Sequence, residues 1–346
     1  MREGKLRELN DLFQALAGDD YRIVGPKRRG DDVVFAELAS MEDYEAGYVA
    51  TANSAKDFIF ARTEPILSYS YDATQTRVRD LLADVYPPTV ILCRTCDARG
   101  MQSLDAVFGG EYEDDFYLKR RAATIIIAVS CTAADDACFC TSTGGRPDGV
   151  EGADILLTPL PDDGYYVETG SPRGEEILAK YEKIFAPAPE RALRDKAIET
   201  AYKDLRHDLT EAPERIKPWL DNYSNYDSEK WPKMAFRCLS CGACTYVCPT
   251  CHCFDIVDEG KLGAGERKKN WDACQFDHFT LHASGHNPRG RQPLRWRNRF
   301  TCKFKIFWDR WNLPGCVGGG GCLVCLKMNT RTRWEFGTRW TKMSRF

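Results

Sequence analysis

The sequence lacks any apolar run long enough to cross a membrane. Its most apolar stretches, residues 89–93 and 122–129, have the length of buried strands. No apolar segment of the kind that directs secretion follows Met1. We therefore expect a cytoplasmic chain without a membrane anchor.

Two phosphate-binding motifs are also missing. No G-x-G-x-x-G follows a strand pattern and no G-x4-G-K-[S/T] occurs, so nothing supports binding of a nicotinamide or a nucleotide by this chain. The glycine run at residues 318–321 belongs to a loop with cysteines and does not resemble a phosphate cradle. Internal repeats and low-complexity tracts are likewise absent from the sequence.

Cysteine, in contrast, is abundant. The chain has 346 residues, of which 43% are apolar and 29% charged, enough to bury a sizeable core in two or three domains. It contains 16 cysteines. Without a secretion signal, such a number indicates reduced thiols or metal ligands.

The most informative motif is formed by Cys238, Cys241, Cys244 and Cys248, with Pro249 directly after the last. This C-x2-C-x2-C-x3-C-P spacing is that of a loop wrapping a [4Fe-4S] cubane. The first three thiolates reach one cluster, whereas the fourth usually turns toward a second cluster. The motif therefore predicts two clusters. A zinc site is the alternative, but zinc ribbons separate their two C-x2-C pairs by a longer loop.

A second motif is incomplete. Cys316, Cys322 and Cys325 follow the ferredoxin pattern, but a regular motif would have cysteine at Gly319 and again at Leu326, then a proline. The three thiolates predict a cluster with an unusual fourth ligand, a degenerate region, or an open iron that would make the chain a self-contained reductase.

Five further cysteines lie in the strand-rich first part: Cys93, Cys96, Cys131, Cys138 and Cys140. Three of them follow the carboxyl ends of predicted strands, which parallel pairing brings to one edge of a sheet. We predict a third [4Fe-4S] cluster held by Cys96, Cys131, Cys138 and Cys140. Cys93 ends an apolar run, and is expected to be a small buried hydrophobic residue.

Other possible ligands lie between the two motifs. Cys251, Cys253 and Cys274 are expected to line the cluster pocket, and any of them could replace an assigned ligand. His278, His282 and His286 recur every four residues, which on a helix could form a zinc site with Cys274. Surface or packed histidines show the same spacing more often.

Charge is unevenly distributed, although the net charge is only −3. Residues 261–346 contain 18 lysines and arginines against 5 aspartates and glutamates, whereas residues 1–260 contain 30 against 46. A basic segment can bind nucleic acid, but basic side chains also stabilise reduced clusters and dock acidic partners. We expect no nucleic-acid partner.

Periodicity predicts an α+β fold. Residues 4–17 show helical spacing, and residues 33–35, 58–60, 65–67, 90–92, 124–127 and 154–157 read as strands. Helical patterns return over residues 174–208. We predict a mixed α/β domain over residues 1–211, a linker over 212–235, and a mainly helical ferredoxin-like dicluster domain over 236–346.

Several motifs together resemble the beta subunit of cytoplasmic nickel–iron hydrogenases of the sulfhydrogenase type, and the related iron–sulfur subunit of anaerobic sulfite reductase. The resemblance spans most of the chain. It rests on residues 63–67, 96–99, 138–142, 238–254, 271–276, 285–289, 297–303 and 316–318. The departures at Gly319, Leu326 and Lys327 affect only the second carboxy-terminal motif.

The resemblance implies an electron-transfer subunit that makes no bonds itself. It would relay electrons between a flavin subunit that handles NAD(P)H and the small and large subunits of a nickel–iron hydrogenase, or the catalytic subunit of a sulfite reductase. No catalytic residues are therefore predicted. A zinc-bearing interaction module is a further alternative, and it would contain no labile sulfide.

Overall fold

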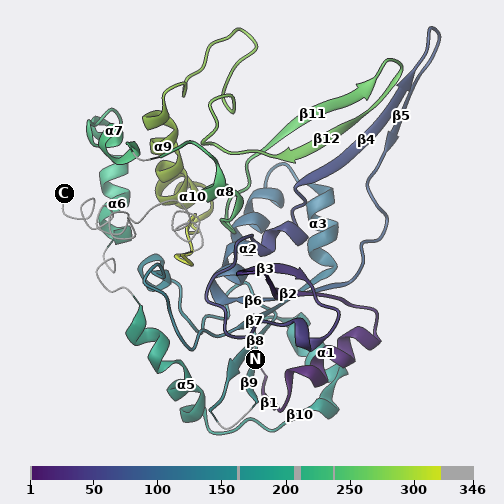
Figure 1. Ribbon diagram of the computed structural model, residues 1–346, viewed down its shortest axis with the longest axis vertical. Coiled ribbons are helices and arrows are strands. Elements are labelled where there is room, and N and C mark those ends of the chain that lie inside the picture. Colours follow the sequence, from purple (N-terminus) through teal and green to yellow (C-terminus); the bar gives the residue numbers. More distant parts are fainter. Residues whose placement is uncertain (1, 162–163, 206–211, 237, 321–346) are drawn as a thin grey trace.

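A computed structural model describes residues 2–161, 164–205, 212–236 and 238–320. Two β-sheets with helices packed around them confirm the predicted α+β class. Figure 1 shows the larger sheet inside the body of the molecule and the smaller sheet extending from the body as a long arm.

The larger sheet has eight strands in the order β10-β1-β9-β8-β7-β6-β2-β3. Its four central strands are parallel: β2 (Arg22–Arg29), β6 (Thr89–Arg94), β7 (Thr124–Val129) and β8 (Ile155–Pro159). Antiparallel strands flank them: β3 (Asp32–Glu37), β9 (Tyr165–Thr169), β1 (Glu3–Leu6) and β10 (Phe185–Ala186). The parallel centre brings the ends of β6 and β7 to one edge, as predicted.

Alternate residues of the central strands feed two hydrophobic cores. On β6, Val90 and Leu92 pack with α1 (Leu9–Gly18) and α4 (Pro172–Lys180). Ile91 and Cys93 point to the opposite face, where α2 (Thr95–Phe108) and α3 (Asp115–Ala122) lie. The fully apolar strands are thus explained by burial on both faces.

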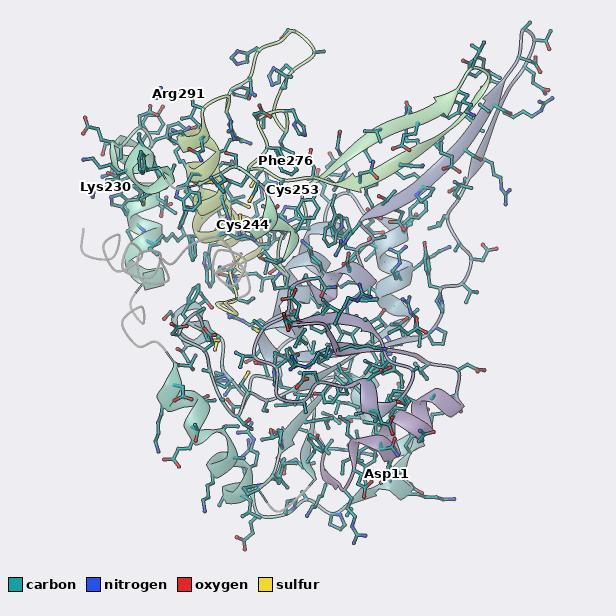
Figure 2. All side chains as sticks on the ribbon, in the orientation of Figure 1. Asp11, Lys230, Cys244, Cys253, Phe276 and Arg291 are labelled. Atoms are coloured by element: carbon teal, nitrogen blue, oxygen red, sulfur yellow. The ribbon has the colours of Figure 1, made fainter. Side chains whose placement is uncertain are left out.

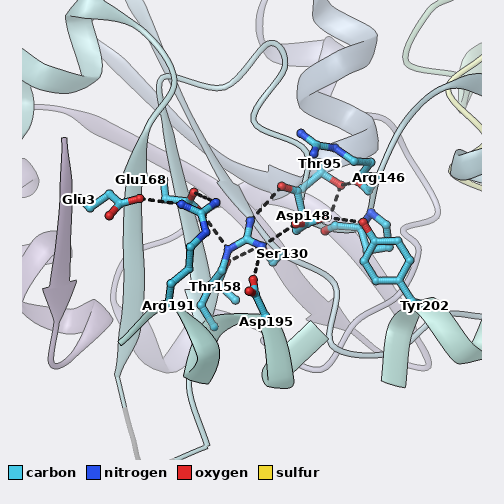
Figure 3. Close-up of polar contacts among 12 residues, drawn as sticks. Glu3, Thr95, Ser130, Arg146, Asp148, Thr158, Glu168, Arg191, Asp195 and Tyr202 are labelled. Atoms are coloured by element: carbon cyan, nitrogen blue, oxygen red, sulfur yellow. Dashed lines mark hydrogen bonds and ion pairs between the residues drawn. The ribbon is translucent and has the colours of Figure 1, made fainter. Parts of the chain in front are cut away.

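A buried ion-pair network attaches α5 (Arg191–Asp204) to the sheet (Figure 3). Arg194 is only 5% exposed and pairs with Asp148 at 2.6 Å and with Glu168 at 3.0 Å. Glu168 lies on β9, whereas Asp148 lies in the loop before β8. Arg194 therefore joins a sheet strand to a loop that follows the cysteines at 138 and 140.

The smaller sheet combines two segments that are distant in sequence. Its order is β11-β12-β4-β5, built from β11 (Phe254–Lys261), β12 (Ala264–Trp271), β4 (Thr63–Tyr71) and β5 (Thr76–Asp80). β12 pairs with β4, from Ala264 opposite Ser70 to Asn270 opposite Thr63. The hairpin of β11 and β12 was not predicted for the carboxy-terminal part.

Short helices form a third core beside the sheets. They are α6 (Ala212–Asp221), α7 (Lys230–Ala235) and α9 (Gln292–Thr301), with a π-helical turn at Cys302–Ile306. Two further short helices of the described chain, α8 (Ala243–Tyr246) and α10 (Phe307–Trp311), contribute no residue to this core. Trp231, Trp296 and Phe300 pack there against Phe139 from the first part of the chain. The segment 212–235, expected as a linker, thus contributes α6 and α7 to this core.

Two local predictions were wrong. Residues 3–6 form β1 and the helix begins only at Leu9, because Glu3–Leu6 pairs with β9. Residues 55–58 form a 3₁₀ turn in which Ser54 Oγ accepts a hydrogen bond from the backbone N–H of Lys56, so the predicted strand at 58–60 is absent. Within the described residues, no helix has both the length and the apolar character needed to cross a bilayer.

Candidate metal centres

The first cysteine motif folds as a tight loop that leads from the surface inward. Ser240 and Gly242 have left-handed φ values of 55° and 72°. A Cβ at Gly242 would lie 2.6 Å from the ring of Phe276, so only glycine suits this position. Cys241 is exposed, Cys238 and Cys244 are half-buried, and Cys248 is buried.

Cys248 belongs to a second group of thiols, which we call the central thiol set: Cys248, Cys251, Cys253, Cys274 and Cys302. Phe254, the first residue of β11, pairs with Trp271, the last of β12. Because the two ends of a hairpin meet, Cys253 lies beside Cys274, and their thiols interact directly. Cys251 interacts in the same way with Cys248.

Two buried lysines and a half-buried arginine lie around the central thiol set. Lys56 Nζ donates to the carbonyl oxygens of Thr245 (3.0 Å) and Cys251 (2.9 Å), and Arg299 donates to Cys251 Sγ at 3.5 Å. Lys303 Nζ donates to Thr250 Oγ1 at 2.5 Å. Positive charge at these positions favours the thiolate form that binds a metal.

Burial and the neighbouring thiols act in opposite directions on the pKa of each lysine, and the net result differs between Lys56 and Lys303. Burial lowers the pKa of Lys56 to about 8, although the thiols of Cys251 and Cys248 oppose this effect. Burial also disfavours the charge on Lys303, but the thiols of Cys248, Cys251 and Cys302 outweigh it and raise the pKa of Lys303 above its ordinary value. Lys303 is therefore a permanent buried cation beside Cys248.

The four predicted ligands of the first part of the chain are electrostatic neighbours, and we call them the amino-terminal thiol set: Cys96, Cys131, Cys138 and Cys140. Cys96 lies in the first turn of α2 and Cys131 follows β7. Burial raises the pKa of the Cys96 thiol, and the neighbouring thiols of Cys131, Cys140 and Cys138 raise it further. Cys93, in contrast, lies in the core beneath α2.

The loop at residues 316–320 touches both thiol sets. Gly318 accepts a hydrogen bond on its carbonyl oxygen from the Phe139 N–H at 2.9 Å. Cys96, Cys248 and Cys316 line one cavity of about 50 Å³ beside this loop. Cys322 and Cys325 lie outside the described residues.

A separate histidine site finds no helix to support it. His278 lies in a bend, and His282 and His286 lie in irregular loop, where their rings meet edge to face at 5.4 Å. Across the described ranges, no three Cys, His, Asp or Glu side chains converge closely enough to hold a single metal ion.

Some of these features escaped the sequence analysis. Cys302 was not among the predicted ligands, and Lys56 lies in a 3₁₀ turn next to the segment mistaken for a strand. The usable signal was the placement of Cys253 and Cys274 just outside one charged stretch, residues 254–271, whose two ends a hairpin brings together. Nothing in the sequence marks Lys303 as the lysine that faces the thiols. Its neighbour Lys305 is also basic, yet it pairs with Asp221 at the surface.

Figure 2 shows the region that contains Cys244 and Cys253, at the junction between the short helices, the arm and the body. Several sulfur atoms gather there. The donor set consists of free thiols in all fourteen cysteines that the structure describes. Buried thiols beside buried cations suit iron–sulfur clusters, which thiolates hold and which carry negative charge.

Comparison with known proteins agrees with this arrangement. Residues 237–329 match the 4Fe-4S dicluster domain family. The chain is 31% identical over 304 residues to sulfhydrogenase 2 subunit beta of Pyrococcus furiosus, which covers 87% of either chain.

Solved structures give no comparable guide. A serine palmitoyltransferase from S. paucimobilis aligns with 63% of this chain and 56% of its own at 9% identity, with a TM-score of 0.20. The enzyme from Sphingomonas wittichii aligns with 64% of this chain and 56% of its own at 9% identity, with a TM-score of 0.19. These scores carry no argument about fold or function. On its sequence similarity over most of its length, the chain belongs to the family of sulfhydrogenase beta subunits.

Proposed function

We propose that this chain is the iron–sulfur electron-transfer subunit of a hydrogenase complex. The observation that carries the proposal is the path of thiols from the exposed Cys241, through the buried Cys248 and the central thiol set, to the amino-terminal thiol set. Such a path suits a chain that passes electrons between two partners. Family membership supports the same function.

The first motif would hold one [4Fe-4S] cluster through Cys238, Cys241 and Cys244. Cys248 would reach the second cluster, together with Cys316 and the cysteine at 322, and the cysteine at 325 would reach back to the first cluster. The spare thiols of Cys251, Cys253 and Cys274 lie within the central set and are candidates for remaining ligand positions. When bound, a [4Fe-4S] cluster accepts and returns one electron at a time.

The amino-terminal thiol set is proposed as a third redox site, with Cys131, Cys138 and Cys140 at its centre. Arg94 gives this set a buried cation like those of the central set. It is 7% exposed, stacks over the Tyr48 ring at 4.4 Å, and donates to the carbonyl oxygen of Ser130 at 3.2 Å. The pKa of Arg94 is raised in spite of burial, partly by Cys131 and Cys96.

The residues around the thiols have two tasks in this proposal. Lys56, Lys303 and Arg299 stabilise negative charge and so favour uptake of an electron. Trp271 and Phe307 shield the same region from water: Trp271 lies under Lys56 Nζ at 4.2 Å and Phe307 is fully buried. Low water content strengthens each of these charge interactions.

We further propose that electrons enter from a flavin subunit that handles NAD(P)H and leave to the small and large subunits of a nickel–iron hydrogenase. The sequence similarity to a sulfhydrogenase beta subunit supports partners of this kind. The cytoplasm is the proposed location, because free thiols persist in reducing compartments.

The test uses the assembled complex purified without oxygen. Cys241→Ser should abolish electron flow from NAD(P)H to the catalytic subunit, while the half-reactions with artificial dyes at each end persist. Cys93→Ala, which alters a thiol in the apolar core, is the matched control and should leave that flow intact. Unchanged overall turnover in Cys241→Ser would refute the relay.

Metal content gives an independent check. About twelve iron atoms and twelve labile sulfides per chain are expected for three clusters, and about eight for two. Zinc without labile sulfide would refute the proposal.

A further inference from the structure

The glycine at position 319 stands directly against a cysteine from the other end of the chain. A Cβ built on Gly319 would lie 2.7 Å from Cys96 Sγ and 3.1 Å from Cys96 Cβ. Real carbon and sulfur atoms do not approach so closely, so a side chain at 319 and the thiol of Cys96 compete for one place. Position 319 is where the regular ferredoxin spacing has its second cysteine.

The neighbouring glycine explains why the loop comes so near. Gly318 has a φ of 65°, and a Cβ there would lie 2.5 Å from the carbonyl oxygen of Phe139. Only a residue without a side chain permits this contact. The loop at 316–320 is therefore built to lie flat on the amino-terminal part of the chain, with Cys316 at its start.

Cys96 also shares a cavity with two proposed ligands of the second carboxy-terminal site. Cys96, Cys248 and Cys316 line the cavity of about 50 Å³, whereas Cys131, Cys138 and Cys140 do not. Cys316 and Cys248 are electrostatic neighbours. The cavity thus presents three thiols from three separate segments of the chain.

A second contact fixes Cys96 in this position. Helix α2, which has Cys96 in its first turn, packs closely against Pro249 of the first motif. The approach is so close that a Cβ added at Gly100 would lie only 2.7 Å from Pro249 Cβ. Pro249 directly follows Cys248. One turn of α2 therefore separates this contact from Cys96, and both Cys96 and Cys248 line the cavity.

We propose that Cys96 replaces the missing cysteine of position 319 as a ligand of the second carboxy-terminal cluster. The inference rests on the proposed function, since it assigns a ligand to one of the proposed clusters. Cys96 would lose its thiol proton and bind iron as a thiolate, beside Cys248 and Cys316. The two halves of the chain are then joined through one cluster, and Cys131, Cys138 and Cys140 remain for the amino-terminal site.

Metal analysis of single and double variants distinguishes this assignment from the sequence-based one. If Cys96 and Cys316 bind the same cluster, Cys96→Ala, Cys316→Ala and the double variant each lose about four iron atoms and four sulfides per chain. If Cys96 belongs to the amino-terminal site, the double variant loses about eight. The electron paramagnetic resonance signal that is lost from the reduced protein must also be the same in both single variants.

A rescue variant supplies the positive result. Gly319→Cys in the Cys96→Ala background provides a thiol at the place that Cys96 has vacated, and should restore the lost iron, sulfide and signal. The same change in Cys131→Ala should restore nothing, and Cys93→Ala should keep the full wild-type content as a control for folding.

The assignment is overturned by an eight-iron loss in the double variant, by full iron content in Cys96→Ala or Cys316→Ala, or by failure of Gly319→Cys to restore iron to Cys96→Ala. Absence of labile sulfide from the wild-type protein would instead refute the proposed function itself. The two failures are therefore distinguishable in one set of samples.

Discussion

Replacing Lys303 with methionine should lower the reduction potential of the cluster bound by Cys248. Lys303 is 6% exposed, and its ammonium group donates to Thr250 Oγ1, which lies 3.2 Å from Cys248 Sγ. Methionine keeps much of the side-chain volume and removes the positive charge. The added electron of the reduced state then loses a favourable interaction, so reduction becomes harder.

The magnitude follows from the same distances. The two contacts of 2.5 Å and 3.2 Å place the ammonium nitrogen within about 6 Å of the sulfur. At about 6–8 Å and an effective dielectric constant near 20, one charge acts on one electron with about 2–3 kcal/mol. For a one-electron couple this corresponds to a fall of about 90–120 mV.

Lys305 provides the matched control on the same stretch of chain. It forms ion pairs with Asp221 at 2.6 Å and Asp309 at 2.8 Å, and a third of its side chain is exposed. Solvent and the two carboxylates screen its charge, so Lys305→Met should shift the potential by less than about 30 mV. Lys303→Arg should keep the potential near the wild-type value.

The assay is a dye-mediated redox titration followed by electron paramagnetic resonance, with iron and sulfide counted in each sample. Thr250 also donates to the carbonyl oxygen of Gly315 at 2.7 Å, and the substitution removes neither of these groups, so the loop around Cys248 should keep its second anchor. Equal potentials in Lys303→Met and Lys305→Met, at full iron content, would refute the electrostatic role of Lys303.

Three further predictions concern stability, and urea unfolding under anaerobic conditions measures each. Gly100→Ala should lower the free energy of unfolding by about 1–3 kcal/mol, because the new methyl group meets Pro249. Gly18→Ala, which adds its methyl group in open space, should change this free energy little. An equal loss in both variants would contradict the packing argument. Arg194→Leu should lower the free energy of unfolding by about 3–5 kcal/mol, because Asp148 and Glu168 remain buried without their cation. Arg191→Leu, at a half-exposed site, should lower it by less than about 1 kcal/mol. A small effect in both variants would mean that the buried network does not stabilise the fold. Lys269→Met should lower the free energy of unfolding by about 3–5 kcal/mol, because Lys269 pairs with Glu64 at 3.2 Å and Asp114 at 2.5 Å where the arm joins the body. Its more exposed neighbour Lys268 should tolerate the same change. The prediction fails if the two variants unfold at the same urea concentration.

The sequence predicted the central parallel strands because their apolar runs are long, β-branched and buried on both faces. Thr124–Val129 and Thr89–Arg94 are of this kind. It also predicted that Cys96 and Cys131 would meet, since parallel strands place their carboxyl ends together. These are consequences of local pattern and of a general topological rule.

Long-range pairing was less accessible. Residues 254–271 are rich in charged side chains, and every residue of β11 is exposed or half-buried. No alternation of apolar and polar residues therefore indicates the hairpin. Its partner, β4, lies about 200 positions earlier in the chain, and only the fold brings the two together. The contact between Gly319 and Cys96 has the same origin, which is why the missing cysteine looked like a defect in the sequence.

The shared arm also has a bearing on the order of folding. β12 can complete its pairing with β4 only after about 200 intervening residues have been made, and contacts of such separation form slowly. Until then, thiols from the two ends of the chain remain apart and the exposed edge of β4 offers a template for wrong partners. Recombinant production should therefore benefit from slow synthesis with iron supplied throughout, and residues 237–329 should behave poorly as an excised ferredoxin module.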